Sequence, residues 1–323
     1  MKREFGWDAI TRDADSVVTV GTFDGVHRGH QAIIDYLLQR AEAQGGTSTL
    51  ISFDPHPRTV VHGQDVPLLT TLDERAQVLE RIGLDRLVVI PFTESFAQLE
   101  PVKYVEEVLV GRVGLQEITI GYDHRFGKKR QGDVDLLRTL GETHEFSVDV
   151  IPAQEVDHEV VSSSKIRDLL QSEGEVEEAM AMLGRPYRLR GTVARGAGRG
   201  RQIGYPTANL DVQTPRKLTP RRGVYAVRVE LPNGAVHGGM LNIGRRPTFE
   251  GMNVTVEVHI FGFDDSIYGE TLSVEFLQRV RDERKFDSAE DLVVQLSEDE
   301  RHCKQAVEAF DTSSRRVPDS SAS

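Results

Sequence analysis

The sequence has 323 residues, 38% apolar and 28% charged, a composition typical of a globular chain long enough for two domains. Its formal net charge of −12 repels nucleic-acid backbones, so we expect no nucleic-acid partner. The single cysteine, Cys303, excludes an intrachain disulfide and a cysteine-based metal site. No apolar run reaches the roughly 18 residues of a membrane span, and the first residues lack the apolar core of a secretory signal. We therefore expect a cytoplasmic protein with no membrane partner.

The first half of the chain alternates strand-like and helix-like patterns. Apolar, β-rich runs lie at 16–21, 47–53, 85–92, 115–121 and 147–152. Stretches of helical spacing separate them, and Thr71-x-x-Glu74 is a capping box that opens one of the helices. This alternation predicts βαβ units, and therefore an α/β domain with a Rossmann-like parallel sheet. Ligands bind such sheets beyond the carboxyl ends of the strands, which His27, Asp54 and Asp123 all follow.

The turn after the first strand reads Gly21-Thr-Phe23-Asp-Gly-Val-His27-Arg-Gly-His30. A strand that ends in a glycine turn and opens a helix directs free backbone N–H groups toward one point, which attracts phosphate. The imidazoles of His27 and His30 can reach the same anion. A His-x-Gly-His turn in this position is typical of nucleotidyltransferases that release pyrophosphate. The alternative is a strand-to-helix turn with two solvated histidines.

Two later loops of the first half add candidate residues. Phe-Asp54-Pro-His-Pro follows the second strand, and its prolines stiffen the loop, although loops of this kind more often only turn the chain. Gly-Tyr-Asp123-His-Arg-Phe126-Gly follows the fourth strand and precedes a basic run at 128–130. That run either attracts phosphate or is a solvated loop.

The segment Ser-Ser-Ser164-Lys165-Ile-Arg167 begins a helix. Serine hydroxyls and helix N-terminal amides bind anions, and the lysine and arginine add positive charge. Alone, the segment is at least as readily an ordinary N-cap, but together with His27 and His30 it predicts a triphosphate clamp. Release of pyrophosphate requires that charge on the leaving group be neutralised, and a divalent metal, Mg²⁺, would share that work.

The pattern changes after about residue 184. Strand-like runs follow in quick succession at 187–194, 223–231, 235–243, 253–262 and 271–278. Pro232-Asn-Gly234 is a hairpin turn between two of them. Strands without intervening helices predict an antiparallel β-barrel or sandwich, and a helix pattern runs from Ser288 to about Phe310.

We therefore expect a first domain over 1–184, a second domain over 185–311, and a disordered serine-rich tail over 312–323.

Oxygen-bearing side chains follow a glycine-rich segment of the second half. Gly198 and Gly200 lie in a stretch whose backbone N–H groups could wrap phosphates, although such a stretch alone is more often a mobile loop. Thr207 and Asn209 offer hard oxygen ligands and point to one side of an extended segment. Glu257 lies on the polar face of an alternating strand, where it is suited to take a proton from a substrate hydroxyl, or is simply solvent-facing.

Taken together, these motifs resemble the prokaryotic bifunctional riboflavin kinase/FAD synthetase family over roughly residues 10–310. The first half matches through Gly-Thr-Phe-Asp-Gly-Val-His-Arg-Gly-His, Phe-Asp-Pro-His-Pro, Gly-Tyr-Asp-His-Arg-Phe-Gly and Ser-Ser-Ser-Lys-Ile-Arg. The second half matches through Gly-Arg-Gly-Arg-Gln-Ile-Gly-Tyr-Pro-Thr-Ala-Asn-Leu, Val-Glu-Val-His-Ile-Phe and Phe-Leu-Gln-Arg-Val-Arg-Asp-Glu-Arg-Lys-Phe.

The resemblance implies two ATP-dependent reactions. The barrel would phosphorylate riboflavin to FMN, with Glu257 as the base and with Thr207 and Asn209 holding Mg²⁺ and ATP phosphates. The α/β domain would join FMN and ATP into FAD and release pyrophosphate. The resemblance assigns the nucleotide and its phosphates to Gly21, Phe23, His27, His30, Asp123, Ser164, Lys165 and Arg167, and flavin contacts to Asp54 and Phe126. The expected partners are the small-molecule substrates ATP, riboflavin and FMN. We expect the chain to be a monomer or a weak homo-oligomer.

Two other interpretations compete with this one. Another nucleotidyltransferase with an appended barrel shares His-x-Gly-His but does not predict Thr207, Asn209 or Glu257. A non-catalytic flavin-binding regulator would have lost Glu257, Thr207 or His30, and all are present. One departure concerns Asp123, which Tyr122 and His124 flank where the family usually has an acidic or small residue and then an aromatic one.

Overall fold

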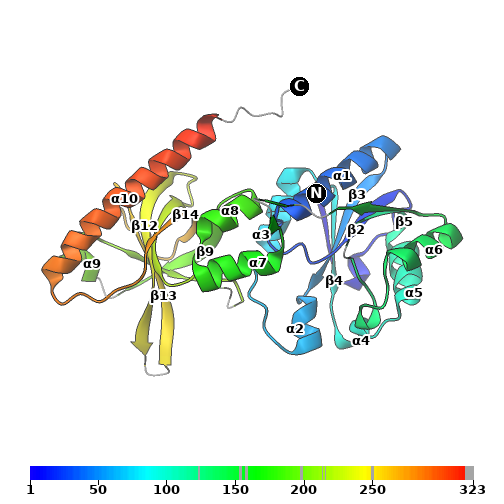
Figure 1. Ribbon diagram of the computed structural model, residues 1–323, viewed down its shortest axis with the longest axis horizontal. Helices are drawn as coiled ribbons and strands as arrows, with labels where there is room; N and C mark the ends of the chain where they lie inside the picture. Colours follow the sequence, from blue (N-terminus) through cyan, green and yellow to red (C-terminus); the bar gives the residue numbers. More distant parts are fainter. Residues whose placement is uncertain are drawn as a thin grey trace. The chain divides into compact units, whose positions relative to one another are not determined.

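The computed structural model describes residues 1–122, 124–152, 155–156, 159–196, 199–212, 214, 216–248 and 251–316. Asp123 and Gly198, two of the predicted site residues, lie outside these ranges. The chain divides into two compact units, Met1–Ser163 and Ser164–Ser323, which Figure 1 draws in sequence colours.

The first unit is built on one sheet, confirming the predicted α/β class. Its strands are β1 (Lys2–Phe5), β2 (Ser16–Val20), β3 (Thr47–Asp54), β4 (Arg86–Pro91), β5 (Leu115–Gly121) and β6 (Ser147–Ile151). They are ordered β1-β4-β3-β2-β5-β6, and every neighbouring pair is parallel. The edge strand β1 was not predicted.

Helices and short turns connect these strands. They are η1 (Trp7–Ala9), α1 (Arg28–Gln44), α2 (Pro57–His62), α3 (Leu72–Ile82), α4 (Glu94–Ala97), α5 (Pro101–Lys103), the π-helix η2 (Tyr104–Val113), η3 (Lys128–Arg130) and α6 (Val134–His144). A two-stranded ribbon of β7 (Glu155–Val156) and β8 (Glu159–Val160) precedes the second unit. The capping box at the start of α3 is present, because Thr71 and Glu74 each bond the other's backbone N–H through their side chains.

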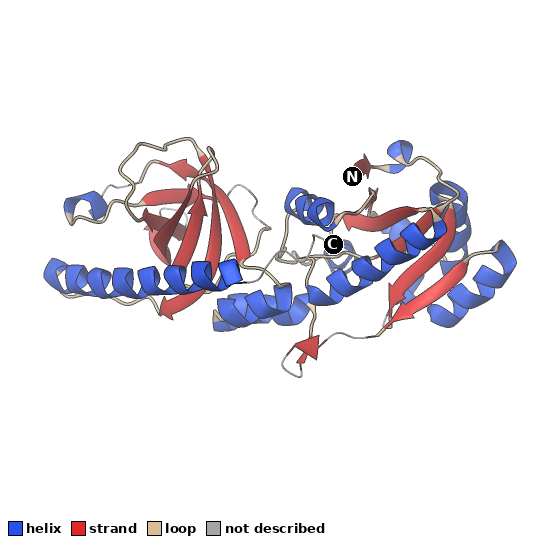
Figure 2. Cartoon of the chain, turned by 90° about the horizontal axis from the view of Figure 1, so that it is seen from above, coloured by secondary structure: helices blue, strands red, loops and turns tan. Residues whose placement is uncertain are grey.

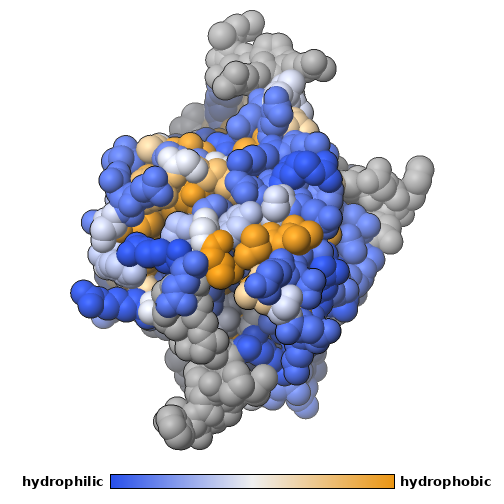
Figure 3. Space-filling model, turned by 90° about the vertical axis from the view of Figure 1, so that its left-hand side faces the viewer, coloured by the Kyte–Doolittle hydropathy of each residue, from blue (hydrophilic) through white to orange (hydrophobic). Residues whose placement is uncertain are grey.

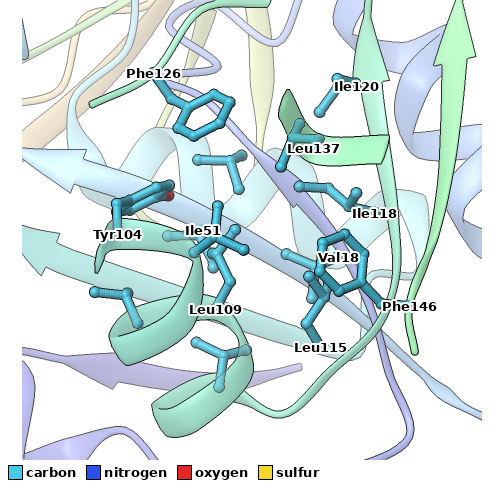
Figure 4. Close-up of a cluster of buried hydrophobic side chains, with 14 of the residues drawn as sticks. Val18, Ile51, Tyr104, Leu109, Leu115, Ile118, Ile120, Phe126, Leu137 and Phe146 are labelled. Atoms are coloured by element: carbon cyan, nitrogen blue, oxygen red, sulfur yellow. The ribbon is translucent and has the colours of Figure 1, made fainter. Parts of the chain in front are cut away.

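The sheet buries both faces, which explains why its strands read as continuous apolar runs. Successive residues of a strand point to opposite sides. Val17 of β2 therefore packs with α1 and α3 on one face, in a cluster that includes Ile34 and Leu79. Val18 packs on the other face with η2 and α6, in the cluster shown in Figure 4.

The second unit contains a closed antiparallel barrel, so the barrel alternative is confirmed over the sandwich. Its strands are β9 (Tyr187–Ala194), β10 (Ala208–Asp211), β11 (Gly223–Glu230), β12 (Val236–Thr248), β13 (Gly251–Ile260) and β14 (Thr271–Arg281), in the order β10-β13-β12-β11-β14-β9. The predicted hairpin at Pro232-Asn-Gly234 joins β11 to β12, and Gly234 takes the positive φ of 82° that the turn requires.

Helices surround the barrel. They are α7 (Ser163–Asp168), the π-helix η4 (Leu169–Glu173), α8 (Val176–Leu183), α9 (Arg199–Gln202) and α10 (Ala289–Arg316). α8 contacts β9 and β14, so this helix belongs to the second unit although it precedes residue 184. The domain boundary that we placed at residue 184 stays a prediction.

The last helix is longer than the sequence pattern indicated. α10 lies along the outside of the barrel in Figure 2, contacts β11, β12 and β14, and continues to Arg316. The expected disordered tail is therefore wrong for residues 312–316, where the helix continues although its apolar spacing has ended. Residues 317–323 lie outside the described ranges.

The molecular surface that faces the viewer in Figure 3 is mostly hydrophilic, with apolar side chains in limited areas. Across the part of the chain that the structure describes, we find no helix of the length and apolarity needed to cross a membrane.

Candidate functional site

The turn between β2 and α1 is tightly wound. Phe23, Gly25 and Val26 adopt positive φ values of 46°, 85° and 40°. Two of these residues are not glycine, and such conformations persist only where the surroundings hold them. A Cβ atom at Gly21 would lie 3.0 Å from the Phe23 ring, so a larger residue here would require that ring to shift. The turn delivers the chain to the N-terminus of α1.

The two predicted histidines of this turn lie together. His27 is the N-cap of α1, and its Nδ1 accepts a hydrogen bond of 3.3 Å from the backbone N–H of His30. The two rings stack with their centroids 3.6 Å apart, and the Phe23 ring lies 4.6 Å from that of His30. The N-terminus of a 17-residue helix favours negative charge, so both imidazoles lie where an anion is stabilised.

Sequence reasoning missed Asp24, which connects this turn to the loop before α3 by hydrogen bonds. It is fully buried, and its carboxylate accepts hydrogen bonds of 3.0 and 2.9 Å from the backbone N–H groups of Leu69 and Thr70. Arg75 of α3 lies 3.7 Å away. An acidic residue between two glycines was a signal, but its partners lie some 45 residues on, beyond any local pattern.

The predicted phosphate segment begins beside the turn. Ser163 Oγ donates a hydrogen bond of 2.9 Å to the Asp24 backbone carbonyl. Ser164, Lys165 and Arg167 follow on α7, where Ser164 is exposed and the other two are half-buried. These three belong to the second unit, so their place relative to the two histidines stays a prediction.

The two predicted flavin residues differ in burial. Asp54 ends β3 and is exposed, whereas Phe126 is buried and its ring lies 5.7 Å from that of Tyr104. Figure 4 shows these two rings at one end of the apolar cluster.

Phe126 belongs to a row of aromatic rings, each within 6.0 Å of the next: Phe126, Tyr104, Phe96, Phe92 and Phe53. The His124 ring stacks on Phe126 at 5.9 Å. Phe53, Phe92 and Phe126 each lie at or just beyond the carboxyl end of a strand. These residues are far apart in the sequence, so the sequence pattern did not reveal the row. Only Phe126 was among the predicted site residues.

The second unit brings three predicted residues together on the barrel. Asn209 of β10 and Glu257 of β13 are direct partners in the strand register. Thr207, just before β10, has its hydroxyl 3.4 Å from a Glu257 carboxylate oxygen. On the other side, Asn242 of β12 is also a register partner of Glu257. Sequence reasoning missed Asn242, because cross-strand register is not visible in the periodicity of one strand.

The glycine-rich segment folds directly against these side chains. A Cβ atom at Gly200 would lie 2.1 Å from the Tyr205 carbonyl oxygen and 3.5 Å from Thr207 Oγ1. A Cβ at Gly196 would lie 2.0 Å from the Asn209 side-chain nitrogen. At Gly200 a side chain would collide with backbone, so this glycine allows the close approach. The segment puts backbone groups beside the cluster of Thr207, Asn209 and Glu257, which we call the barrel cluster.

The fold and the two candidate sites together indicate the class of protein. An α/β unit with a histidine-bearing anion turn is followed by a β-barrel unit with a carboxylate among hydroxyl and amide groups, as expected for a chain with two nucleotide-dependent transferase sites.

Comparisons with known proteins identify the family. The FAD synthetase family model matches residues 9–165, and the riboflavin kinase model matches residues 183–307. The bifunctional riboflavin kinase/FMN adenylyltransferase of Haemophilus influenzae is 36% identical over 87% of this chain and 91% of its own length. The bifunctional enzyme of the same description from Listeria monocytogenes is 38% identical over 90% of this chain and 91% of its own length. The chain belongs to the bifunctional riboflavin kinase/FMN adenylyltransferase family.

A crystal structure from Streptococcus pneumoniae, described as a macrolide-efflux protein, matches with a TM-score of 0.86 and 32% identity. The match covers 94% of this chain and 99% of that one. The likeness therefore extends through both units.

Proposed function

We propose that the barrel cluster and the turn with His27 and His30 each carry out one of the two reactions of the family. The barrel phosphorylates riboflavin with ATP to give FMN, and the α/β domain transfers the adenylyl group of a second ATP to FMN to give FAD and pyrophosphate. The observation that carries the proposal is the convergence on Glu257 of Asn209, its partner in the strand register, and of Thr207, whose hydroxyl lies 3.4 Å from the Glu257 carboxylate.

In the barrel, Glu257 acts as the general base. Its carboxylate takes the proton of the terminal ribityl hydroxyl, whose oxygen attacks the γ-phosphorus of ATP while the bond from that phosphorus to the β–γ bridging oxygen breaks. FMN and ADP are the products. The backbone at Gly196 and Gly200 is suited to hold the phosphates, because these glycines let it approach Asn209 and Thr207 closely.

Magnesium is the cation that this donor set suits. Thr207 and Asn209 would hold it together with the ATP phosphates, since hydroxyl, amide and carboxylate oxygens are the hard ligands that Mg²⁺ prefers. When bound, it neutralises the charge of the phosphates. Among the described residues, no group of three or more histidine, cysteine, aspartate and glutamate side chains could form a metal cage by itself. A cation shared with the nucleotide fits better than a site made by the protein alone.

In the α/β domain, the FMN phosphate is the nucleophile. One of its oxygens attacks the α-phosphorus of ATP, and the bond to the bridging oxygen of pyrophosphate breaks, so no covalent enzyme intermediate is needed. His27, His30 and the N-terminus of α1 stabilise the charge of the leaving group. Ser164, Lys165 and Arg167 complete the clamp, and Gly21 and Phe23 line the nucleotide. Asp123 and Gly198 keep the phosphate roles that their motifs indicate.

The flavin ring of FMN requires a flat apolar surface. Phe126, whose ring belongs to the aromatic row near the carboxyl edge of the sheet, where ligands of such folds bind, is our candidate for an apolar contact with the flavin ring. Asp54, exposed at the end of β3, is suited to a polar flavin contact. We further propose a cytoplasmic enzyme that is a monomer or a weak homo-oligomer and binds no nucleic acid.

The test is to incubate the full chain with riboflavin, ATP and Mg²⁺ and to separate the flavins by chromatography. FMN should appear first and FAD later. A chain that converts supplied FMN to FAD but never phosphorylates riboflavin would contradict the kinase assignment. Binding of flavin with no product would favour a non-catalytic regulator instead.

A further inference from the structure

One histidine of the barrel has a position that the two reactions do not yet explain. His259 is two residues beyond Glu257 on β13, so the two side chains share a face of the strand. Its Nδ1 lies 2.8 Å from the backbone carbonyl oxygen of Pro206. A carbonyl oxygen only accepts hydrogen bonds, so the ring nitrogen carries the proton and donates it. His259 thus ties β13 to the residue directly before Thr207.

The segment that receives this bond is held by few strand contacts. The register between β10 and β13 begins with Ala208 opposite Val258, one residue after Thr207. Pro206 has no N–H to contribute to a ladder. The bond from His259 therefore acts where regular pairing ends, and fixes the stretch that carries Thr207 to the strand that carries Glu257.

The imidazole is itself held in place. The Tyr205 ring lies 5.4 Å from it at 67°, and the Phe261 ring lies 5.8 Å from it at 68°. Tyr205 in turn packs against a buried cluster that includes Cys303 of α10. Two aromatic contacts and a helix thus restrict the rotation of His259, as expected of a residue whose hydrogen bond must have one direction.

We propose that His259 is a positioning residue for phosphoryl transfer, which sets the place of Thr207 relative to the Glu257 carboxylate. The proposal rests on the kinase function argued above and extends it to a group that does not touch the reacting atoms. The Thr207–Glu257 distance of 3.4 Å is at the long end for a hydrogen bond, so a small shift of the 205–207 segment breaks it.

The direction of the bond gives the experiment its design. The side-chain nitrogen of asparagine can occupy nearly the place of Nδ1, whereas that of glutamine corresponds to Nε2. His259→Asn can therefore keep the donor to Pro206, while His259→Gln and His259→Ala lose it. Neither amide is a base, so a proton-accepting role of the ring would be lost in all three variants.

The full-length variants are to be assayed with riboflavin, ATP and Mg²⁺, and separately with supplied FMN. We expect His259→Ala and His259→Gln to lower the kcat of FMN formation by roughly 10- to 100-fold, as misplacement of about 1 Å does, with a smaller change in the KM for riboflavin. His259→Asn should stay within about threefold of the unmutated chain. Thermal unfolding should show that the barrel remains folded, and FAD formation from FMN should be unchanged in all three.

His237→Ala is the matched control, because His237 lies on β12 with its ring 5.5 Å from that of Phe263. It should leave both activities unchanged. A His259→Ala chain as active as the unmutated one would overturn the proposal, as would a folded His259→Asn chain as inactive as His259→Gln. Failure of the unmutated chain to form FMN would instead refute the proposed function.

Discussion

Asn209 and Glu257 face each other across the ladder of β10 and β13, and Asn242 faces Glu257 from the opposite strand, β12. The carboxylate is thus flanked by an amide on each side, with the Thr207 hydroxyl 3.4 Å away. The proposed base thus has neutral polar residues as its strand partners, and its carboxylate lies within hydrogen-bonding distance of the Thr207 hydroxyl.

Replacement of the proposed base, Glu257, is expected to affect one activity and spare the other. Glu257→Gln keeps the shape of the side chain but cannot accept the ribityl proton, so FMN formation should fall by roughly 10²- to 10⁴-fold. FAD formation from supplied FMN should be retained, because His27 and His30 lie in the other unit. Measuring both products from the same preparation checks this. Equal damage to both activities would show that the sites are assigned to the wrong domains.

The reverse pattern is expected for His30→Ala. Loss of one imidazole at the N-terminus of α1 removes stabilisation of the leaving pyrophosphate, so adenylyl transfer should slow by roughly 10²-fold or more. Riboflavin phosphorylation should continue, and FMN should accumulate. An unaffected rate of FAD formation from FMN and ATP would remove the phosphate role of His30.

His27 has a second, structural role that can be measured apart from catalysis. Its Nδ1 caps α1, so His27→Ala should lower the free energy of unfolding of the first unit by roughly 0.5–2 kcal/mol. His27→Asn supplies a capping oxygen and should recover most of that loss, although adenylyl transfer stays slow in both. Urea unfolding followed beside activity distinguishes the roles, and equal stability of the two variants would argue against the cap.

The buried Glu4 should make the free energy of unfolding depend on pH. Burial alone would raise the pKa of this carboxyl, but hydrogen bonds from Lys2, Thr11 and Arg86 outweigh it and lower the pKa to about 2, against an ordinary value of 4.5. A pKa lowered by folding contributes stability that is fully present above pH 4.5 and is lost as the pH falls toward 2. The contribution is on the order of 3 kcal/mol at neutral pH.

Glu4→Gln tests this contribution. The variant should be less stable than the unmutated chain at pH 7, and the difference in the free energy of unfolding should shrink as the pH is lowered through 4 to 2. Urea unfolding at several pH values measures it. A difference that stays constant over this range would show that Glu4 titrates normally in the folded chain.

The single cysteine should be inert in the folded protein. Cys303 is fully buried against the barrel, and burial, with the Asp299 carboxylate nearby, raises the pKa of its thiol to about 12. We expect no reaction with a thiol reagent near pH 8 until denaturant unfolds the second unit, and then one equivalent of reaction. Rapid modification of the native chain would contradict the packing of α10.

Much of this architecture could be predicted from the sequence, because local patterns carry it. Alternating strands and helices indicated the parallel sheet, and the glycine turn with His27 and His30 marked the start of α1. On the barrel, Thr207, Asn209 and Glu257 were chosen by residue type, alternation and the family resemblance, and the structure brings them together.

The features that sequence reasoning missed depend on long-range geometry. Asp24 bonds a loop some 45 residues away, and Asn242 meets Glu257 only through strand register. The aromatic row is assembled from the ends of separate strands, so no single segment contains it. The edge strand β1 has four residues, too few for a periodic pattern.

Mixing two inactive chains tests most directly whether the two sites are separate. Glu257→Gln alone should form very little FAD from riboflavin, ATP and Mg²⁺, and His30→Ala alone should accumulate FMN and form FAD only slowly. A mixture of the two should form FAD, because FMN made by the barrel of one chain can be adenylylated by the α/β domain of the other. If the mixture forms no FAD although each variant keeps its remaining activity, or if either variant alone loses both activities, the assignment of one reaction to each domain is wrong.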